Sequence, residues 1–264
     1  MAIVGGGNMG RALISGLLRR GMLPEDVRVA EISPQARASL TRDFAVSASA
    51  DARAALEGAA VVVIALKPEH VAALIAPLQP LFARTRPVVI SVAAGIRIAS
   101  LQTWCGADVA VVRAMPNRPA LVGAGVTAIS GGSWATSRDL AWGEDVLTAV
   151  GTVVRLPERL LDAVTGLSGS GPAYFFLVAE ALVEAGVQMG LTREVSRTLV
   201  AETMRGSAAL LHETGRDPEV LRAMVTSPAG TTAAGVRTLE ARAVRSAFME
   251  AVAAATERSR NLQR

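Results

Sequence analysis

The apolar residues of this chain change their spacing once, near residue 155. Before that point, short β-branched runs such as 59–66 (AAVVVIAL) alternate with stretches of helical periodicity such as 11–21. A continuous apolar run of this length is typical of a strand that is buried on both faces. Strands that alternate with helices form a parallel sheet with helices on both faces, so residues 1–155 predict an α/β domain. Further strands are expected at 2–4, 27–31, 87–94, 109–116 and 125–130, and further helices at 33–43 and at 68–82, the last broken near Pro77 and Pro80.

After residue 155 the β-rich runs stop and only helical patterns remain. These patterns cover most of residues 173–260, and several of them are apolar on more than one face. Helices of that kind are buried in a bundle or against a second subunit. We therefore expect an all-α domain at 156–264 that carries a homodimer interface.

The composition argues against several classes of partner. Apolar residues make up 51% of the chain, yet no apolar run approaches the roughly 20 residues that a membrane helix needs. A net charge of +4 without a basic run, and with only 3% aromatic residues, argues against nucleic-acid binding. We expect neither a membrane nor a nucleic acid as partner.

The few cysteine and histidine residues limit metal and redox chemistry. The single cysteine, Cys105, excludes an internal disulfide and a cysteine-based metal cluster, and its thiol is expected to be buried and inert. The two histidines, His70 and His212, lie far apart in the sequence and are expected to be structural or exposed. These few residues predict no metal site. The N-terminus shows no basic segment followed by an apolar one, so we expect no secretory signal and a cytoplasmic protein.

The segment GGGNMG, residues 5–10, fits the pattern G-x-G-x-x-G between an apolar strand and a helix. In that setting, backbone N–H groups at the helix start bind the pyrophosphate of a dinucleotide. Gly5 would permit a tight turn, Gly7 the close approach of a phosphate, and Gly10 the contact between helix and strand. Only four residues precede the loop, so either the first strand is short or the translated start lies upstream.

Residues after the second expected strand bear on the choice between NADPH and NADH. Glu31 ends that strand 21 residues after Gly10, where an acid usually binds the ribose 2′-hydroxyl and favours NAD. Ser33, which is placed to cap the next helix with Pro34 behind it, and Arg37 would instead hold a 2′-phosphate. These residues alone leave both cofactors open.

Lys67, in the segment ALKPEHV, is the only lysine among 27 lysine and arginine residues. A compact ammonium on a flexible stem suits the neighbourhood of ribose hydroxyls, where a planar guanidinium would crowd the ring. The alternative is that one surviving lysine is chance. If the first explanation holds, Lys67→Arg weakens cofactor binding more than arginine-to-lysine changes elsewhere.

Seven segments, in order along nearly the whole chain, resemble the pyrroline-5-carboxylate reductase family. They are GGGNMG, ALKPEHV, VISVAAGI and VVRAMPN in the first half, and TGLSGSGPAYFF, MVTSPAGTTAAG and MEAVAAATERSR in the second. The family reduces the cyclic imine 1-pyrroline-5-carboxylate to L-proline with NADPH, or sometimes NADH, in the last step of proline biosynthesis. The resemblance implies an α/β Rossmann domain followed by an all-α dimerisation domain, and often a ring of dimers.

The resemblance also implies a set of cofactor residues. Lys67 and Pro68 would lie beside the nicotinamide half, and the loop after the next strand would border the same end. Ser33 would approach the adenosine phosphate. The implied cofactor-binding residues are Gly5, Gly7, Asn8, Met9, Gly10, Ser33, Ala65, Lys67, Pro68, Ala93, Gly95 and Asn117.

A loop and helix start are implied to hold the substrate carboxylate. The family pattern SPGGTT is here SPAGTT, residues 227–232, and backbone N–H groups at a helix start bind an anion. The residues implied to bind substrate are Ser227, Gly230, Thr231 and Thr232. Thr232 is implied as the catalytic residue, by a hydrogen bond to the imine nitrogen. The alternative for this stretch is an ordinary Ser-Pro helix cap.

Three positions depart from the family pattern. Ala229 stands where the family usually has glycine, so we expect the loop to avoid a positive φ there. Arg118 follows MPN where a small residue is common, and would alter the mouth of the cofactor site. Residues 240–244 (EARAV) replace a glycine-containing turn and would change the dimer contact.

The helical half holds few groups for ketone chemistry. A ketone reductase must protonate a developing alkoxide, usually with Lys, His or Tyr, whereas an imine is protonated before hydride arrives. After Lys67 there is no lysine, and the helical half has one histidine and one tyrosine, Tyr174. This fits imine reduction, including that of a related cyclic imine, better than a hydroxyacid dehydrogenase of the same plan with a lysine acid. A non-catalytic cofactor-binding dimer is the third interpretation.

Overall fold

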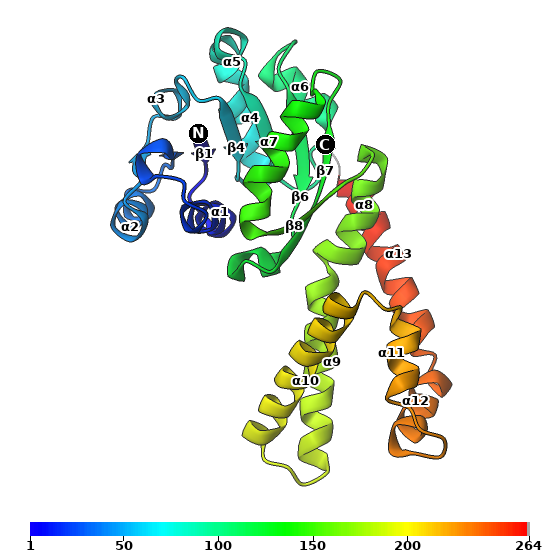
Figure 1. Ribbon diagram of the computed structural model, residues 1–264. Coiled ribbons are helices and arrows are strands. Elements are labelled where there is room, and N and C mark those ends of the chain that lie inside the picture. The colour runs from blue at the N-terminus through cyan, green and yellow to red at the C-terminus, as the bar shows by residue number, and fades with distance from the viewer. Residues whose placement is uncertain (263–264) are drawn as a thin grey trace. The chain divides into compact units, whose positions relative to one another are not determined.

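The computed structural model describes residues 1–262 and divides into two compact units (Figure 1). The first unit takes in residues 1–170 together with the described end of the chain from residue 254, and the second takes in residues 171–253. The sheet ends at Arg155. The domain boundary expected at 155/156 therefore coincides with the end of the sheet, whereas the compact units divide further along the chain.

The first unit is built on an eight-stranded sheet with the strand order β3-β2-β1-β4-β5-β6-β7-β8. The chain adds β2 and β3 on one side of β1 and then places β4 on its other side, so the order of the strands reverses between β1 and β4. Ligands of such sheets bind at that point. The strands are β1 (Ala2–Val4), β2 (Arg28–Ala30), β3 (Ser47–Ser49), β4 (Val61–Ile64), β5 (Val88–Ser91), β6 (Val111–Met115), β7 (Gly125–Gly131) and β8 (Gly151–Arg155).

The sheet is parallel from β3 to β6, and its last two strands run the other way. β7 pairs antiparallel with β6, and β8 pairs parallel with β7. Only residues 116–124 link β6 to β7, which is too short for a crossover between parallel strands. Two strands were not expected from the sequence: β3 is the polar segment Ser-Ala-Ser, and β8 lies at the edge of the sheet, so neither carries a buried apolar run.

Helices cover both faces of the sheet (Figure 1). Alternate residues of one strand enter different cores: Ala2 and Val4 pack in one apolar cluster and Ile3 in the other. The helices of the first unit are α1 (Asn8–Arg19), α2 (Pro34–Phe44), α3 (Ala52–Leu56), α4 (Pro68–Ile75), α5 (Gln79–Thr85), α6 (Ile98–Cys105), α7 (Ser137–Leu147) and α8 (Leu161–Val164). This arrangement confirms the α/β fold class.

Local expectations for these helices are met at two places. Ser33 caps α2, its hydroxyl accepting the N–H of Ala36 at 3.3 Å, with Pro34 at the first position. The helical pattern at 68–82 breaks as α4 ends at Ile75 and α5 begins at Gln79.

Cys105 is buried, and burial raises the pKa of its thiol to about 12, which leaves it inert at neutral pH.

The second unit is helical throughout. It contains α9 (Gly171–Gln188), α10 (Arg193–Thr214), α11 (Pro218–Met224), α12 (Thr231–Ala241) and the first part of α13 (Val244–Leu262). Helices α9 and α10 pack along each other, and the ion pair between Arg193 and Glu184, 2.8 Å long, closes their turn. The continuous helical pattern at 231–260 is interrupted between α12 and α13, where Ala243 has φ 54°.

Candidate active site

The glycine loop joins β1 to α1, and its three pattern glycines have different surroundings. Gly5 has φ 103°, and a Cβ atom there would lie 2.6 Å from the carbonyl oxygen of Ala65. A Cβ atom at Gly10 would lie 2.1 Å from the carbonyl oxygen of Gly5, so both positions require glycine. Gly7 is the N-cap of α1, and a Cβ atom there would meet nothing within 4 Å. The loop thus leaves open space beside Gly7 at a helix N-terminus, which suits an approaching phosphate.

Glu31 holds this loop in place. One of its carboxylate oxygens accepts the N–H of Gly6 and the other accepts the N–H of Ser33, each at 2.8 Å. The guanidinium of Arg37 donates to the carbonyl oxygens of Glu31 and Ile32 at 2.9 and 2.8 Å. The carboxylate at the end of β2 therefore ties the glycine loop to the start of α2, and a cation lies beside it.

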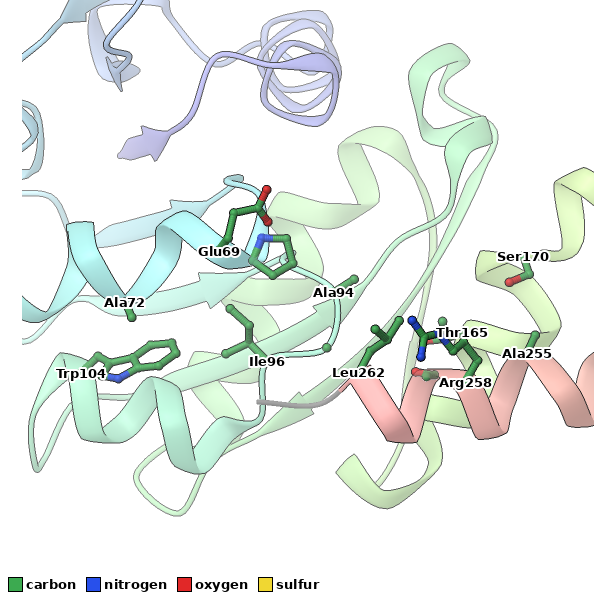
Figure 2. A pocket seen from close by; sticks show the side chains of 13 residues that line it. Glu69, Ala72, Ala94, Ile96, Trp104, Thr165, Ser170, Ala255, Arg258 and Leu262 are labelled. Carbon is green, nitrogen blue, oxygen red and sulfur yellow. The ribbon is translucent and has the colours of Figure 1, made fainter.

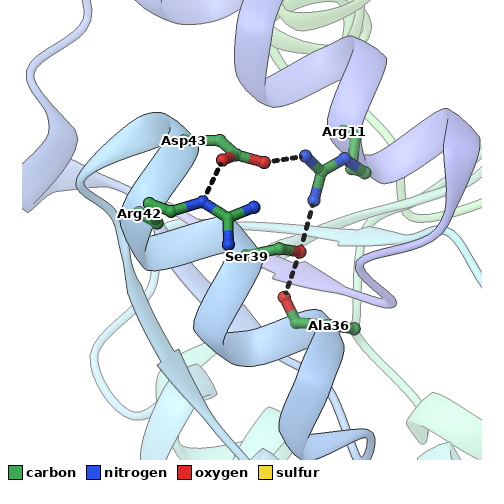
Figure 3. A network of polar contacts seen from close by, with 5 residues as sticks. All are labelled: Arg11, Ala36, Ser39, Arg42 and Asp43. Carbon is green, nitrogen blue, oxygen red and sulfur yellow. Dashed lines mark hydrogen bonds and ion pairs between the residues drawn. The ribbon is translucent and has the colours of Figure 1, made fainter.

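A network of polar contacts fixes α1 against α2 (Figure 3). Arg11, which follows the glycine loop, donates to Ser39 at 3.0 Å and to Asp43 at 2.5 Å, and its guanidinium stacks on the ring of Phe44. Arg42 donates to the other carboxylate oxygen of Asp43. The hydrogen bond from Arg11 lowers the pKa of Asp43, so the pair is ionised at neutral pH. The network thereby ties the start of α1 to the second half of α2.

A cavity of about 280 Å³ opens between the ends of β1 and β2 and helix α4. It is lined mostly by apolar groups, with Glu31 and His70 as its polar members. A narrow apolar slot beside a glycine loop, at the carboxyl ends of parallel strands, has the character of an adenosine site. His70, expected from the sequence to be structural or exposed, is exposed and lines this slot.

A larger cavity, of about 590 Å³, lies within the first unit at the carboxyl end of the sheet (Figure 2). Two of the expected cofactor residues, Pro68 and Gly95, line it, and Gly95 has φ 73°. Thr165, Ser170 and Arg258 supply polar groups to the same cavity. It is large enough for a nicotinamide ring together with a small substrate.

The other expected cofactor residues lie in different surroundings. Ser33 and Lys67 lie at helix N-termini, as N-caps of α2 and α4, and the side chain of Lys67 is exposed. Ala93 is buried in the core, and the side-chain oxygen of Asn117 accepts the N–H of Val126 at 2.9 Å, which holds β7. Asn8 is exposed, Met9 packs against the core and Ala65 contributes its carbonyl oxygen beneath Gly5.

Most residues that line the large cavity were not predicted from the sequence, among them three that supply polar groups. Thr165 begins a π-helical turn, Thr165–Gly169, and Ser170 directly follows it; turns of this kind are frequent at functional sites. The motif TGLSGSGP marked the segment but gave no role to its members. Arg258 comes from α13, 93 positions after Thr165, and only tertiary structure brings it to the cavity.

The segment implied to bind substrate lies in the second unit, at the start of α12. Gly230 is the N-cap of α12, and no side chain of the described residues caps this helix. The first N–H groups of α12, including those of Thr231 and Thr232, therefore have no side-chain partner and are available to an anion. A Cβ atom at Gly230 would lie 2.4 Å from the hydroxyl of Ser227 and 3.1 Å from its carbonyl oxygen, so a larger residue would displace the Ser227 side chain. The cofactor residues and this loop thus belong to different compact units of the chain.

The expectation for Ala229 is wrong. The residue has φ 57°, so the loop keeps the left-handed conformation that glycine favours instead of avoiding it. The turn is set by Gly230, whose N–H donates to the carbonyl oxygen of Ser227 at 3.0 Å, and alanine tolerates the conformation at a cost of about 1 kcal/mol. The backbone around Ser227 therefore keeps its shape despite the substitution.

Two family models match parts of the chain. Residues 158–262 match the model described as pyrroline-5-carboxylate reductase dimerisation, and residues 1–95 match the model described as NADP oxidoreductase coenzyme F420-dependent. A pyrroline-5-carboxylate reductase of Mycobacterium tuberculosis is 46% identical over 285 aligned positions, which cover all of this chain and 96% of that protein. This chain belongs to the pyrroline-5-carboxylate reductase family.

Solved reductases of this family share the fold over the whole chain. The structure of a pyrroline-5-carboxylate reductase from Coxiella burnetii is 35% identical, with a TM-score of 0.96, and the match covers 100% of this chain and 98% of that one. The pyrroline carboxylate reductase of Plasmodium falciparum, solved with NADP bound, is 28% identical with a TM-score of 0.87 over 100% and 97% of the two chains. The sequence resemblance is thus confirmed over both units.

Proposed function

We propose that this chain reduces 1-pyrroline-5-carboxylate to L-proline, with NADPH as hydride donor and NADH as the weaker alternative. Membership of the family gives the reaction. The single structural observation that carries the proposal is the uncapped start of α12, which presents Thr231 and Thr232. An open helix N-terminus beside a threonine hydroxyl suits a small anionic imine.

The residues of the first unit fit a dinucleotide. The open space at Gly7 takes the pyrophosphate, and the slot beside Glu31 takes the adenosine. When bound, the cofactor supplies the hydride. Pro68 and Gly95 would border its nicotinamide end, with Lys67 beside the ribose.

The proposed preference for NADPH rests on the contacts of Glu31. Both of its carboxylate oxygens already accept backbone N–H groups, which leaves the acid engaged in holding the loop. Ser33, Arg37 and the N-terminus of α2 then favour a 2′-phosphate at this place. An acid after β2 thus acts here as a backbone clamp.

The second unit supplies the proposed substrate residues. The carboxylate accepts N–H groups from the start of α12, together with the hydroxyl of Ser227 and the backbone of Gly230 and Thr231. The hydroxyl of Thr232 hydrogen-bonds the imine nitrogen and orients it toward the hydride. No strong acid or base is required, because the imine nitrogen is protonated before transfer.

The role of Thr232 is tested by Thr232→Ala. We expect kcat/KM for 1-pyrroline-5-carboxylate to fall about 100-fold, because removal of one positioned donor costs that much in other enzymes. Oxidation of NADPH, and separately of NADH, measures the rate, and proline formation confirms the product. Thr232→Ser should keep most of the activity, because the hydroxyl remains.

Thr238→Ala is the matched control, since its hydroxyl donates within α12 to the carbonyl oxygen of Ala234. It should turn over as the wild type does. Turnover that Thr232→Ala leaves unchanged would discard the role of Thr232 but keep the function. A wild-type enzyme that forms no proline with either cofactor would point to another imine or to a non-catalytic dimer.

The proposed role of Lys67 is tested by Lys67→Arg. We expect the dissociation constant for NADPH to rise about fivefold, because a planar guanidinium crowds the ribose where a compact ammonium does not. Arg53→Lys, at an exposed position of α3 in the same unit, should leave the constant unchanged. Equal affinities in wild type and Lys67→Arg would mean that the single lysine is chance.

We also propose that the second unit forms a homodimer and that dimers assemble into a ring. The stretch Glu158–Gln188 is long and apolar enough to cross a membrane by length and composition alone. A second copy fits it better than lipid, because the matched family model is one of dimerisation and because Glu180 and Glu184 lie in α9. This proposal also includes the domain boundary at 155/156, the lack of a membrane partner and a cytoplasmic location. Cell fractionation tests the last two.

A further inference from the structure

In a separate cavity of about 420 Å³ in the first unit, every lining residue within 1–262 is charged. They come from the loop before α6, from β6, from the 3-10 helix Glu158–Leu160, from α8 and from α13. The lining residues are Arg97, Arg113, Glu158, Arg159, Asp162 and Arg260. None of them belongs to the proposed cofactor or substrate residues.

The two carboxylates of this cavity are engaged by the protein itself. One oxygen of Glu158 accepts the guanidinium N–H of Arg113 at 3.0 Å and the N–H of Ile98 at 2.7 Å. Asp162 is buried and accepts the hydroxyl of Ser259 at 2.8 Å. The side chain of Arg113 is only 5% exposed and that of Glu158 is 33% exposed, so the pair is half-buried and forms a fixed wall of the cavity.

The four guanidinium groups outnumber the two carboxylates, which leaves the lining with a net charge of +2. Arg159 makes no hydrogen bond or ion pair with the residues that the structure describes. Among the described residues, Arg260 pairs only with Glu257, at 3.4 Å, and both side chains are largely exposed, so this pair is weak. Guanidinium forks that converge on one cavity match the oxygens of phosphate and carboxylate groups.

We propose that this cavity binds a small oxyanion, and that a dianion of the phosphate type fits best because its charge balances the excess. Arg159 and Arg260 are the groups available to contact it, and Arg113 and Glu158 form the fixed floor. The cavity shares a wall with the large cavity at the nicotinamide end, because Ser259 lines that cavity and donates to Asp162 of this one. The proposal does not depend on imine reduction, since its readout is binding.

The test is calorimetric titration of the full-length protein with inorganic phosphate at pH 8, at constant ionic strength set with sodium chloride. Saturating NADP⁺ and L-proline are present throughout; they occupy the proposed phosphate positions at Gly7 and beside Ser33 and the proposed carboxylate site at the start of α12. We expect one phosphate per chain. Arg159→Gln and Arg260→Gln should each weaken binding about tenfold, because each removes one charge-assisted contact.

Arg53→Gln is the matched control, as an exposed arginine of the same unit outside the cavity. It should leave phosphate affinity unchanged. Both cavity variants are at exposed positions and keep the pair of Arg113 and Glu158, so the fold should persist, and tryptophan fluorescence checks this. The proposal is overturned if phosphate fails to bind in the presence of NADP⁺. Equal weakening by Arg53→Gln would likewise overturn it, since binding would then be screening of surface charge.

Discussion

The two compact units differ in where their apolar side chains lie. Every buried apolar side chain of the described residues belongs to the first unit, where two clusters fill the faces of the sheet. In the second unit, Phe175 and Phe176 are each 65% exposed and Met249 is 72% exposed. The first unit thus completes a core within one chain, whereas the second presents apolar surface that water does not favour.

This difference follows from the two kinds of secondary structure. A strand of the sheet buries both of its faces between helix layers of the same chain, as alternate residues of β4 do. The helices of the second unit have apolar residues on more than one face, and packing α9 along α10 leaves one of those faces uncovered. Apolar periodicity alone therefore does not tell whether a residue's partner lies in the same chain.

The largest expected effect comes from placing a charge on the uncovered face. Phe176→Asp should abolish the proposed homodimer, because a carboxylate would have to be desolvated at the interface. Sedimentation velocity measures the change from dimer to monomer. Leu23→Asp is the control, because Leu23 is 54% exposed but belongs to the first unit, and it should leave assembly unchanged.

An unchanged sedimentation coefficient in Phe176→Asp would mean that this face is not the interface. Purification of the wild type only with detergent would instead favour lipid as the cover of α9. After either result, a second copy of the chain would no longer account for the exposed apolar side chains of the second unit.

The second prediction compares two phenylalanines. Phe82 is fully buried in the first unit, and Phe82→Ala should lower the free energy of unfolding of that unit by about 3–5 kcal/mol. The three tryptophans, Trp104, Trp134 and Trp142, all lie in that unit, so urea unfolding followed by their fluorescence reports on it alone. Phe176→Ala should leave that transition unchanged.

Far-UV circular dichroism adds the helices of the second unit. In Phe176→Ala we expect an earlier loss of helical signal that worsens as the protein is diluted, since the side chain acts through a second copy. A loss that is independent of protein concentration would show that Phe176 is covered within its own chain. Equal shifts of the fluorescence transition in both variants would show that the units unfold as one.

Much of the first unit could be predicted from the sequence, because local rules decide it. The glycine loop, the cap at Ser33 and the buried run of β4 each need only neighbouring residues to be recognised. The strands β3 and β8 were missed because their residues form edge strands without an apolar run. The antiparallel direction of β7 follows from the short link 116–124, and the pattern of apolar residues carries no information about the length of that link.

The candidate site was predicted less completely, for tertiary reasons. The role of Glu31 depends on which backbone groups reach its oxygens, and Arg258 joins Thr165 at one cavity only after the chain has folded. The prediction for Ala229 failed because a residue's preference was weighed without its surroundings. The turn that Gly230 makes with Ser227 holds the backbone there, and alanine accepts the strain.

The smallest expected effect concerns alanines in the left-handed conformation, which occur in both units. Ala45 has φ 56° at the end of α2, and Ala243 has φ 54° between α12 and α13. Glycine at either position relieves the contact of Cβ with the backbone but adds freedom to the unfolded chain, so we expect a net gain of about 0.5–1 kcal/mol. Ala38→Gly, inside α2, is the control and should lower the free energy of unfolding by about 1 kcal/mol.

The gain in stability from Ala45→Gly should appear in tryptophan fluorescence, and that from Ala243→Gly only in the helical signal. If both gains moved the same transition, the two units would share one folding equilibrium, and the contrast between a closed core and an open apolar face would not extend to their stability.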